Sequence, residues 1–319
     1  MSEVEKQNAD ATSELLDCVI LGAGPAGLTA LTYLTRFHRR AVALGGSGPR
    51  PRVLSIDRTY NLPGYPEGIP GSVLMRRLRE QAEEMGGEVR ETIATHIEGC
   101  NGNFKVHLED GAPLRARKVI LAMGVRDREP DIPGISKHVG HFLRYCPVCD
   151  GYEHTDKRLG ILGSGHSVAR HALFLRTFSN DITIFLHGKS RETLGRYTAT
   201  LEKNGIAVQE PRVVRVIEDE GDPVSEYTGS GICLEDGTEH RLSVLYGALG
   251  CDLNLEPVHH LGLRLDDESY IITDCRQETG IRGIYAAGDI VSQINQISVA
   301  FGQATIAAVE IHNVLDDED

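Results

Sequence analysis

The stretch Cys18–Gly27, which reads CVILGAGPAG, decides the fold of this 319-residue chain. A short apolar run leads directly into a glycine-rich turn, and a helical pattern follows it. In such a strand–turn–helix unit the first glycine allows the tight turn, the second lets a pyrophosphate approach the backbone, and the third lets the helix pack on the strand. The free N–H groups of the helix start also favour phosphate. The residues predicted to bind a dinucleotide here are Gly22, Gly24, Pro25, Ala26 and Gly27.

One component of the usual dinucleotide pattern is absent from this first unit. An acid about 20 residues after the turn commonly binds the ribose. The second strand instead ends in Ala43–Gly46, which reads ALGG and contains no acid. The ribose must therefore be held in another way.

A second unit of the same kind begins at the strand Leu159–Leu162, and a further strand follows at Ile182–Leu186. Its match is looser, because Val168 occupies the third glycine position. A site for the 2′-phosphate of NADP would require arginines after the second strand, but only Lys189 and Arg191 are basic there, as in an ordinary solvated loop. The candidate residues for this second nucleotide are Gly163, Gly165, His166, Ser167, Val168, His187, Lys189 and Arg191.

Between the two glycine turns lies Cys146–Gly151, which reads CPVCDG. A CxxC turn lets two sulfurs close a disulfide and commonly lowers a thiol pKa. Asp150 follows the second sulfur directly and is a candidate acid or base. Half of a zinc site is the alternative interpretation, with His141 and His154 nearby, although no second close Cys pair exists. We predict catalytic roles for Cys146, Cys149 and Asp150, and no metal.

Length, charge and cysteine usage narrow the function classes. The chain is long enough for two domains of about 150 residues each. A net charge of −13 argues against a nucleic-acid partner, and no apolar run is long enough to span a membrane. The start, Met1–Glu14, lacks the basic end and apolar run of a secretion signal. Seven irregularly spaced cysteines favour a reducing cytoplasm, so we expect a cytoplasmic protein.

The order of the motifs predicts an α/β protein in which one nucleotide-binding domain is inserted into another. Apolar, glycine-punctuated stretches at Val119–Gly124 and Leu242–Gly250 are typical of crossings between domains. Asp289 ends a buried strand, where it either meets a ligand crevice or caps the next helix. The expected boundaries are a flexible tail at 1–16, a first nucleotide-binding domain at 17–125 and 248–315, an inserted domain at 126–247 that carries the CxxC, and a tail at 316–319.

Taken together, these motifs resemble the low-molecular-weight thioredoxin reductases from about Asp17 to Leu315. The resemblance implies two Rossmann-like three-layer domains, FAD in the discontinuous one and NADPH in the inserted one. It also implies a homodimer that passes electrons through FAD and the Cys146–Cys149 pair to thioredoxin or a similar small redox protein. Cys149 would lie nearest the flavin, Cys146 would attack the substrate disulfide, and Asp150 would be the acid.

The same resemblance assigns further FAD-binding residues. Asp289 would hold the ribityl chain, and the segment from Asn295 to Ile297 would lie at the isoalloxazine ring. Beyond the glycine turn, the predicted FAD residues are Asn61, Gly124, Asp289, Asn295, Gln296 and Ile297.

The chain departs from the family pattern mainly in the inserted domain. His187-Gly188-Lys189 stands where the family has His-Arg-Arg, and Val168 stands where it usually has Ala. Asn295-Gln296 replaces an Arg-Gln pair. FAD and dithiol chemistry therefore carry over better than NADPH. Branches of the family that draw electrons from ferredoxin, bind a second flavin, or oxidise small dithiols with oxygen remain alternatives, as does a non-catalytic redox sensor.

Overall fold

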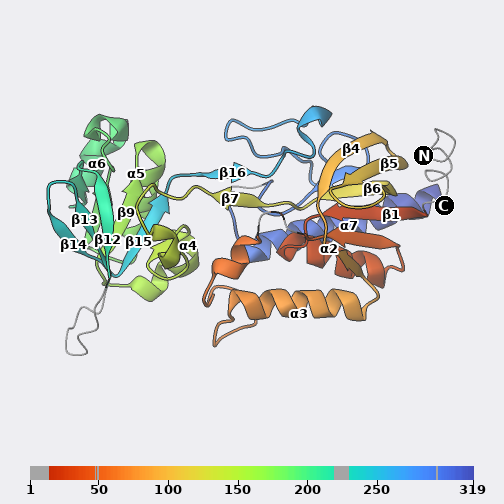
Figure 1. Ribbon diagram of the computed structural model, residues 1–319, viewed down its shortest axis with the longest axis horizontal. Coiled ribbons are helices and arrows are strands. Elements are labelled where there is room, and N and C mark those ends of the chain that lie inside the picture. The colour runs from red at the N-terminus through yellow and green to blue at the C-terminus, as the bar shows by residue number, and fades with distance from the viewer. Residues whose placement is uncertain (1–13, 47, 49, 219–229, 292–293) are drawn as a thin grey trace. The chain divides into compact units, whose positions relative to one another are not determined.

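A computed structural model describes residues 14–46, 48, 50–218, 230–291 and 294–319, and the chain divides into two compact units (Figure 1). The first unit holds the described residues up to Leu54, together with Ile69–Arg126 and Leu253–Asp319. The second unit holds Ser55–Gly68 and Asp127–Asp252. Each unit contains one of the two glycine turns. The predicted α/β class, with one Rossmann-like unit inserted into another, is confirmed.

The first unit is built on a seven-stranded sheet with a parallel centre. β1 (Leu15–Leu21) pairs in parallel with β2 (Ala41–Leu44) on one side and β6 (Leu114–Leu121) on the other. β3 (Glu88–Arg90) continues the sheet beyond β2, and β17 (Ile284–Ala286) pairs with β6. Parallel strands are covered on both faces, which is why β1 and β6 end in continuous apolar runs.

An antiparallel hairpin extends this sheet. β4 (Ala94–Cys100) pairs with β5 (Asn103–Leu108), and β5 pairs with β6. Along β4 only Ala94 and Ile97 are buried, so most of this strand faces solvent.

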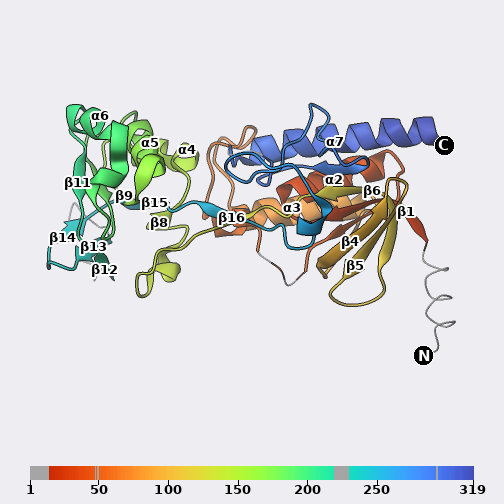
Figure 2. The same ribbon diagram turned by 90° about the horizontal axis from the view of Figure 1, so that it is seen from above.

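The helices of the first unit are α2 (Pro25–Arg36), α3 (Gly71–Glu84) and α7 (Ile297–Glu318). Small side chains let α7 pack closely on α2, and Figure 2 shows the two helices running alongside each other. The alanines of α7 that share one buried core with α2 are Ala300, Ala304, Ala307 and Ala308.

The second unit is built on a five-stranded parallel sheet in the order β11-β10-β9-β15-β8. Its strands are β8 (Leu143–Arg144), β9 (Leu159–Gly163), β10 (Ile182–Phe185), β11 (Ala207–Gln209) and β15 (Val244–Ala248). Strands β9, β10 and β15 are buried at nearly every position, as expected for a covered parallel sheet.

Two apolar cores lie in this second unit. One combines α5 (Gly165–Leu175) with residues of β9, β10 and β15. The other includes Val213, Ile232 and Leu234 from a three-stranded antiparallel sheet. That sheet consists of β12 (Val213–Ile217), β13 (Gly231–Leu234) and β14 (Glu239–Arg241). The short elements of the chain are η1 (Arg52–Ser55), η2 (Ile135–His138), α4 (Pro147–Asp150), η3 (Tyr152–His154), η4 (Arg191–Tyr197), α6 (Thr198–Lys203) and η5 (His259–Leu261).

The chain passes between the units through β7 (Val125–Asp127) and β16 (Cys251–Leu253), which pair with each other. The loop 55–68, which holds Asn61, clusters with the second unit rather than the first. Across the described ranges, no helix is both long enough and apolar enough to cross a bilayer.

Both ends of the described chain differ from the predicted tails. Of the predicted tail 1–16, residues 1–13 lie outside the described residues, whereas Leu15 already pairs with β6. At the other end α7 continues to Glu318. Glu318 forms a 2.8 Å ion pair with Lys118, whose side chain is buried. The acidic end of α7 is therefore bound by cations of β6, a strand far away in the sequence. The local sequence does not reveal this contact.

The contact between the glycine turn and α2 predicts the effect of adding a single methyl group. A Cβ at Gly27 would lie 1.8 Å from the carbonyl oxygen of Gly22. We expect Gly27→Ala to lower the free energy of unfolding by about 1–3 kcal/mol, because the helix must move away from the strand. Urea denaturation followed by circular dichroism measures this change.

Gly302→Ala is the matched control for this substitution. Gly302 lies exposed on α7, and an added Cβ would meet no atom within 4 Å. Alanine should raise stability there by about 0.5–1 kcal/mol, because it restricts the unfolded chain and favours helix. Equal effects of the two substitutions would contradict the close approach at Gly27.

Candidate active site and cofactor-binding residues

The sulfur pair lies at the start of α4 in the second unit. Cys146 and Cys149 form a disulfide, with their Cα atoms 5.3 Å apart. Cys146 is the extended residue that caps the helix, Pro147 follows at the first helical position, and the Cys149 N–H donates to the Cys146 carbonyl oxygen at 3.1 Å. The CxxC sequence thus builds the turn that brings its two sulfurs together.

Gly151 allows this turn to pack against the rest of the unit. Its N–H donates to the Pro147 carbonyl oxygen at 2.9 Å. A Cβ at Gly151 would lie 2.7 Å from both that oxygen and the ring of Phe178. The final glycine of CPVCDG is therefore required by close packing.

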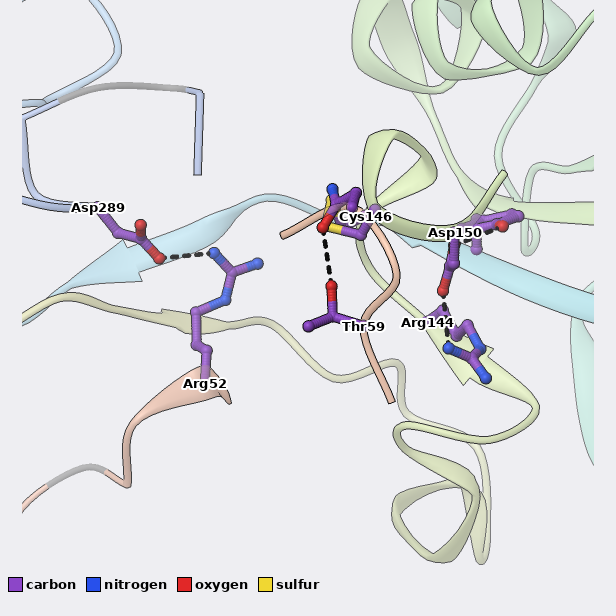
Figure 3. Close-up of a disulfide and its surroundings, with 9 residues drawn as sticks. Arg52, Thr59, Arg144, Cys146, Asp150 and Asp289 are labelled. Carbon is purple, nitrogen blue, oxygen red and sulfur yellow. Dashed lines mark hydrogen bonds and ion pairs between the residues drawn. A yellow bond between two sulfur atoms is a disulfide. The ribbon is translucent and has the colours of Figure 1, made fainter. Parts of the chain in front are cut away.

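Asp150, the predicted acid, accepts hydrogen bonds from two side chains (Figure 3). Tyr246 donates its hydroxyl to Oδ1 at 2.7 Å, and Arg144 donates from Nη1 to Oδ2 at 2.8 Å. Burial raises the pKa of Asp150 above its ordinary value, while the Tyr246 hydrogen bond and the Arg144 charge act in the opposite direction. The carboxyl of Asp150, the residue after Cys149, is thus a half-buried group with a hydrogen-bond donor on each oxygen.

The two donors come from neighbouring strands of the five-stranded sheet. Arg144 on β8 and Tyr246 on β15 are direct partners in the parallel register. Neither residue was singled out by the sequence analysis. Arg144 lies two positions before the first cysteine and offered a local signal, whereas Tyr246 is connected to Asp150 only through the strand pairing.

The two histidines of the zinc alternative have other neighbours. The ring of His154 meets that of Tyr246 edge-on at 6.4 Å, and its Nδ1 lies 3.3 Å from the Ser243 hydroxyl. Burial, followed by the charge of Arg144, lowers the pKa of His154 to about 4. His141 accepts a hydrogen bond from Arg144 Nε at its backbone oxygen. Among the described residues, no group of three or more His, Cys, Asp or Glu side chains is arranged to hold a metal ion.

The first glycine turn has the geometry that a bound pyrophosphate requires. Gly22 has φ +110°, and a Cβ there would lie 2.3 Å from the carbonyl oxygen of Ala122. At Gly24 the nearest atom to such a Cβ is Cβ of Pro51, 3.9 Å away, so this backbone remains approachable. Pro25 and Ala26 begin α2, whose first turn holds no acid. The turn therefore fits the phosphates of FAD.

Asp289 lies beyond the end of β17 and pairs with Arg52. The two side chains meet at 3.0 Å between Nη1 and Oδ2, and each is 23% exposed (Figure 3). Asp289 does not cap α7, because that helix begins at Ile297 with Gln296 as its cap. Arg52 could not be predicted as a partner of Asp289, because no local pattern connects it with an acid 237 positions away.

The other residues predicted to bind FAD lie on loops and at a helix start. Asn61 is in the loop that clusters with the second unit, and its Oδ1 lies 2.8 Å from Thr59 Oγ1. Gly124 has φ +64° and accepts from the side chain of Asn254 at 3.2 Å. Asn295 and Gln296 directly precede α7, and Ile297 is its first residue.

The second glycine turn repeats part of this arrangement. Gly163 has φ +151°, and its Cβ would lie 2.7 Å from the Ala248 carbonyl oxygen. Gly165 has φ +74° with open space around it. His166 and Ser167 are exposed at the start of α5, whereas Val168 is fully buried in the core. A nucleotide therefore has access to His166 and Ser167 but not to Val168.

The segment after β10 carries few groups directed at a phosphate. His187 accepts a hydrogen bond at Nδ1 from the Val213 N–H, 3.2 Å away. Burial, and then the charge of Arg212, lowers the pKa of His187, so the ring is neutral at pH 7. Arg191 lies 3.9 Å from Glu202 and 3.8 Å from Glu210. Lys189 is exposed.

Comparison with known families identifies the class of protein. Residues 16–304 match the pyridine nucleotide-disulphide oxidoreductase family, so the chain belongs to that family. The predicted class, a flavoprotein disulfide oxidoreductase that resembles thioredoxin reductase, is confirmed.

Its relatives agree over nearly the full length. Thioredoxin reductase of Bacillus subtilis (strain 168) is 27% identical, with 95% of this chain and 96% of that protein covered. That of Mycolicibacterium smegmatis is 29% identical, with coverages of 95% and 97%. Among solved structures, thioredoxin reductase from Streptococcus pyogenes MGAS5005 superimposes with a TM-score of 0.86 at 26% identity, covering 96% and 100% of the chains. The structure of HlmI superimposes with a TM-score of 0.84 at 29% identity, and the match covers 96% of this chain and 94% of HlmI.

The Arg52–Asp289 pair predicts a loss of flavin when its cation is removed. Arg52→Gln leaves Asp289 without its charge partner at the edge of the glycine turn, so the dissociation constant of FAD should rise about tenfold or more. Visible absorbance of the purified protein, and titration of stripped protein with FAD, measure the change.

Arg76→Gln provides the control for this loss of charge. Arg76 pairs with Glu80 on the exposed face of α3 in the same unit, and its removal should leave flavin content unchanged. Full flavin retention by Arg52→Gln would remove Arg52 from the cofactor site.

Proposed function

We propose that this protein is an FAD-dependent enzyme that reduces the disulfide of thioredoxin or a similar small redox protein. The disulfide between Cys146 and Cys149, followed in the chain by Asp150 with its two hydrogen-bond donors, is the observation that carries the proposal. The names of the relatives support the same reaction, because several of them are thioredoxin reductases.

The FAD site is proposed from the first glycine turn and the residues around it. Gly22, Gly24 and the start of α2 would hold the pyrophosphate, and Asp289 with Arg52 would hold the ribityl chain. Asn61, Gly124 and the segment from Asn295 to Ile297 are the remaining proposed FAD contacts. FAD, when bound, would supply the electron pair that opens the disulfide.

The roles of the sulfurs follow from thiol–disulfide exchange. Cys146 would attack the substrate disulfide as a thiolate, forming a mixed disulfide. Cys149 would then attack Cys146 and release the reduced substrate, so the Cys146–Cys149 bond forms again. Asp150 would give a proton to the leaving thiolate.

Cys149→Ser tests these roles. The variant should keep its bound flavin but lose reduction of a disulfide substrate by at least about 100-fold, because no second sulfur can resolve the mixed disulfide. The assay measures thiols released from oxidised thioredoxin, with dithionite as the reductant so that the nature of the donor does not matter.

Cys275→Ser is the matched control, because this cysteine is exposed and forms no disulfide. It should retain full activity. If Cys149→Ser reduced the substrate as fast as the unaltered enzyme, the proposed mechanism would be wrong.

A second candidate keeps this chemistry but replaces NADPH as the donor. The segment after β10 favours it: Gly188 offers no side chain, the His187 ring is engaged by Val213, and Arg191 lies near two glutamates. Residues 187–191 offer a 2′-phosphate a single arginine, Arg191. Ferredoxin or a second flavin would then be the electron donor. In the remaining alternative a small dithiol is the donor and oxygen is the acceptor.

Stopped-flow mixing of the flavin-loaded protein with NADPH separates the two candidates. Bleaching of the flavin within seconds at micromolar NADPH would support NADPH as the donor. With the segment as it stands we expect no such bleaching, while dithionite reduces the flavin normally. Peroxide formation from a small dithiol in air would identify the oxygen-using reaction.

The assembly and the cellular compartment are also proposals. We propose a homodimer in the cytoplasm, with no nucleic-acid or membrane partner. Sedimentation of the flavin-loaded protein would measure its mass. A redox sensor would instead turn over slowly and retain a protein partner in only one oxidation state, so multiple turnovers with thioredoxin would argue against that alternative.

A further inference from the structure

The carboxyl of Asp150 faces only hydrogen-bond donors. Tyr246 donates to one oxygen and Arg144 to the other, at 2.7 and 2.8 Å. A guanidinium has no acceptor atom. Burial, and then the neighbouring Asp150, raises the pKa of Tyr246, so its hydroxyl keeps its proton and can donate. A protonated Asp150 would direct its own O–H at one of these donors, so the arrangement suits the ionised form.

The two donors differ in burial and in their place in the sheet. The Tyr246 residue is 1% exposed and lies in the middle of β15, so its hydroxyl has a fixed direction. The Arg144 side chain is 22% exposed, and that of Asp150 is 13% exposed. Arg144 comes from β8, at the edge of the sheet, and its Nε donates to the His141 carbonyl oxygen at 3.0 Å. Tyr246 therefore contributes a buried donor of fixed direction, and Arg144 contributes a charged donor from the edge of the sheet.

The other titratable groups around this carboxyl act more weakly. Glu153, on the next turn of the chain, carries a like charge that favours protonation of Asp150. His154 packs on Tyr246 and is neutral at pH 7, because its pKa is lowered to about 4. Arg144 is thus the nearby cation that opposes the effect of burial.

We propose that Arg144 and Tyr246 are positioning residues that hold Asp150 ionised beside the closed disulfide and let it take up a proton when the sulfur pair is reduced. Reduction of the disulfide by two electrons and one proton gives one thiol and one thiolate. The new thiolate adds a negative charge to the turn that carries Asp150, so the carboxylate becomes easier to protonate. That proton is then available for the leaving thiolate of the substrate.

This inference rests on the proposed function only for the reduction step, and the charge state of Asp150 can be measured without turnover. Infrared difference spectra of the oxidised protein across a pH series report the carbonyl band of a protonated carboxyl. Subtraction of the Asp150→Asn spectra isolates the band of Asp150. Tyr246→Phe and Arg144→Gln should each move its midpoint upward by about one pH unit or more, with Arg144→Gln giving the larger shift because it also removes a charge.

Two further variants complete the experiment. Arg144→Lys keeps the charge but loses the planar donor, so its midpoint should lie between those of the unaltered protein and Arg144→Gln. Arg158→Gln removes an exposed cation from the same unit, where Arg158 pairs with Asp181 at 3.0 Å, and should leave the midpoint unchanged. Midpoints that stay fixed in both Tyr246→Phe and Arg144→Lys, with native circular dichroism, would overturn the proposal.

Reduction of the sulfur pair provides the second measurement. In the unaltered protein the midpoint of Asp150 should rise when dithionite opens the disulfide, and Arg144→Gln should show a smaller rise because its cation is already absent. An equal midpoint in both oxidation states would overturn the redox-linked part of the proposal. If the protein proved unable to reduce thioredoxin while these shifts were observed, the proposed function would fail and the inference about Asp150 would stand.

Discussion

Both units depend on the same constraint: a glycine lies very close to a backbone carbonyl group at the end of a neighbouring strand. In the first unit a Cβ at Gly22 would lie 2.3 Å from the Ala122 oxygen, and in the second a Cβ at Gly163 would lie 2.7 Å from the Ala248 oxygen. Both glycines have positive φ. A side chain at either position would force the strand end and the turn apart, and the helix start would no longer lie at the carboxyl edge of the sheet.

The two turns differ at the position where the helix leans on its strand. Gly27 meets the carbonyl of Gly22 so closely that no side chain fits, whereas Val168 fills the same position with a buried side chain. In the first unit the helix α2 lies close to its strand, and alanines of α7 complete the core on α2. The second unit fills its core with larger side chains.

Local patterns made much of this molecule predictable. The glycine turns, the CxxC turn and the acids Asp150 and Asp289 each carry their signal within a few residues. Arg52 and Tyr246 could not be found in this way, because each reaches its acid through a contact between segments far apart in the sequence. The contact that holds the end of α7 is not predictable locally for the same reason, since Lys118 lies 200 positions from Glu318. Propensity and spacing do not encode such pairings, which arise only when the strands are aligned.

One strand of the second unit serves both the glycine turn and the sulfur pair. The carbonyl oxygen of Ala248 on β15 lies close to Gly163. Tyr246, two positions earlier on the same strand, donates its hydroxyl to Asp150. The groups after β10, which would select the donor, come from a different part of the sheet. Substitutions in the segment after β10 would therefore leave the turn at Gly163 and the acid Asp150 in place, because both depend on β15.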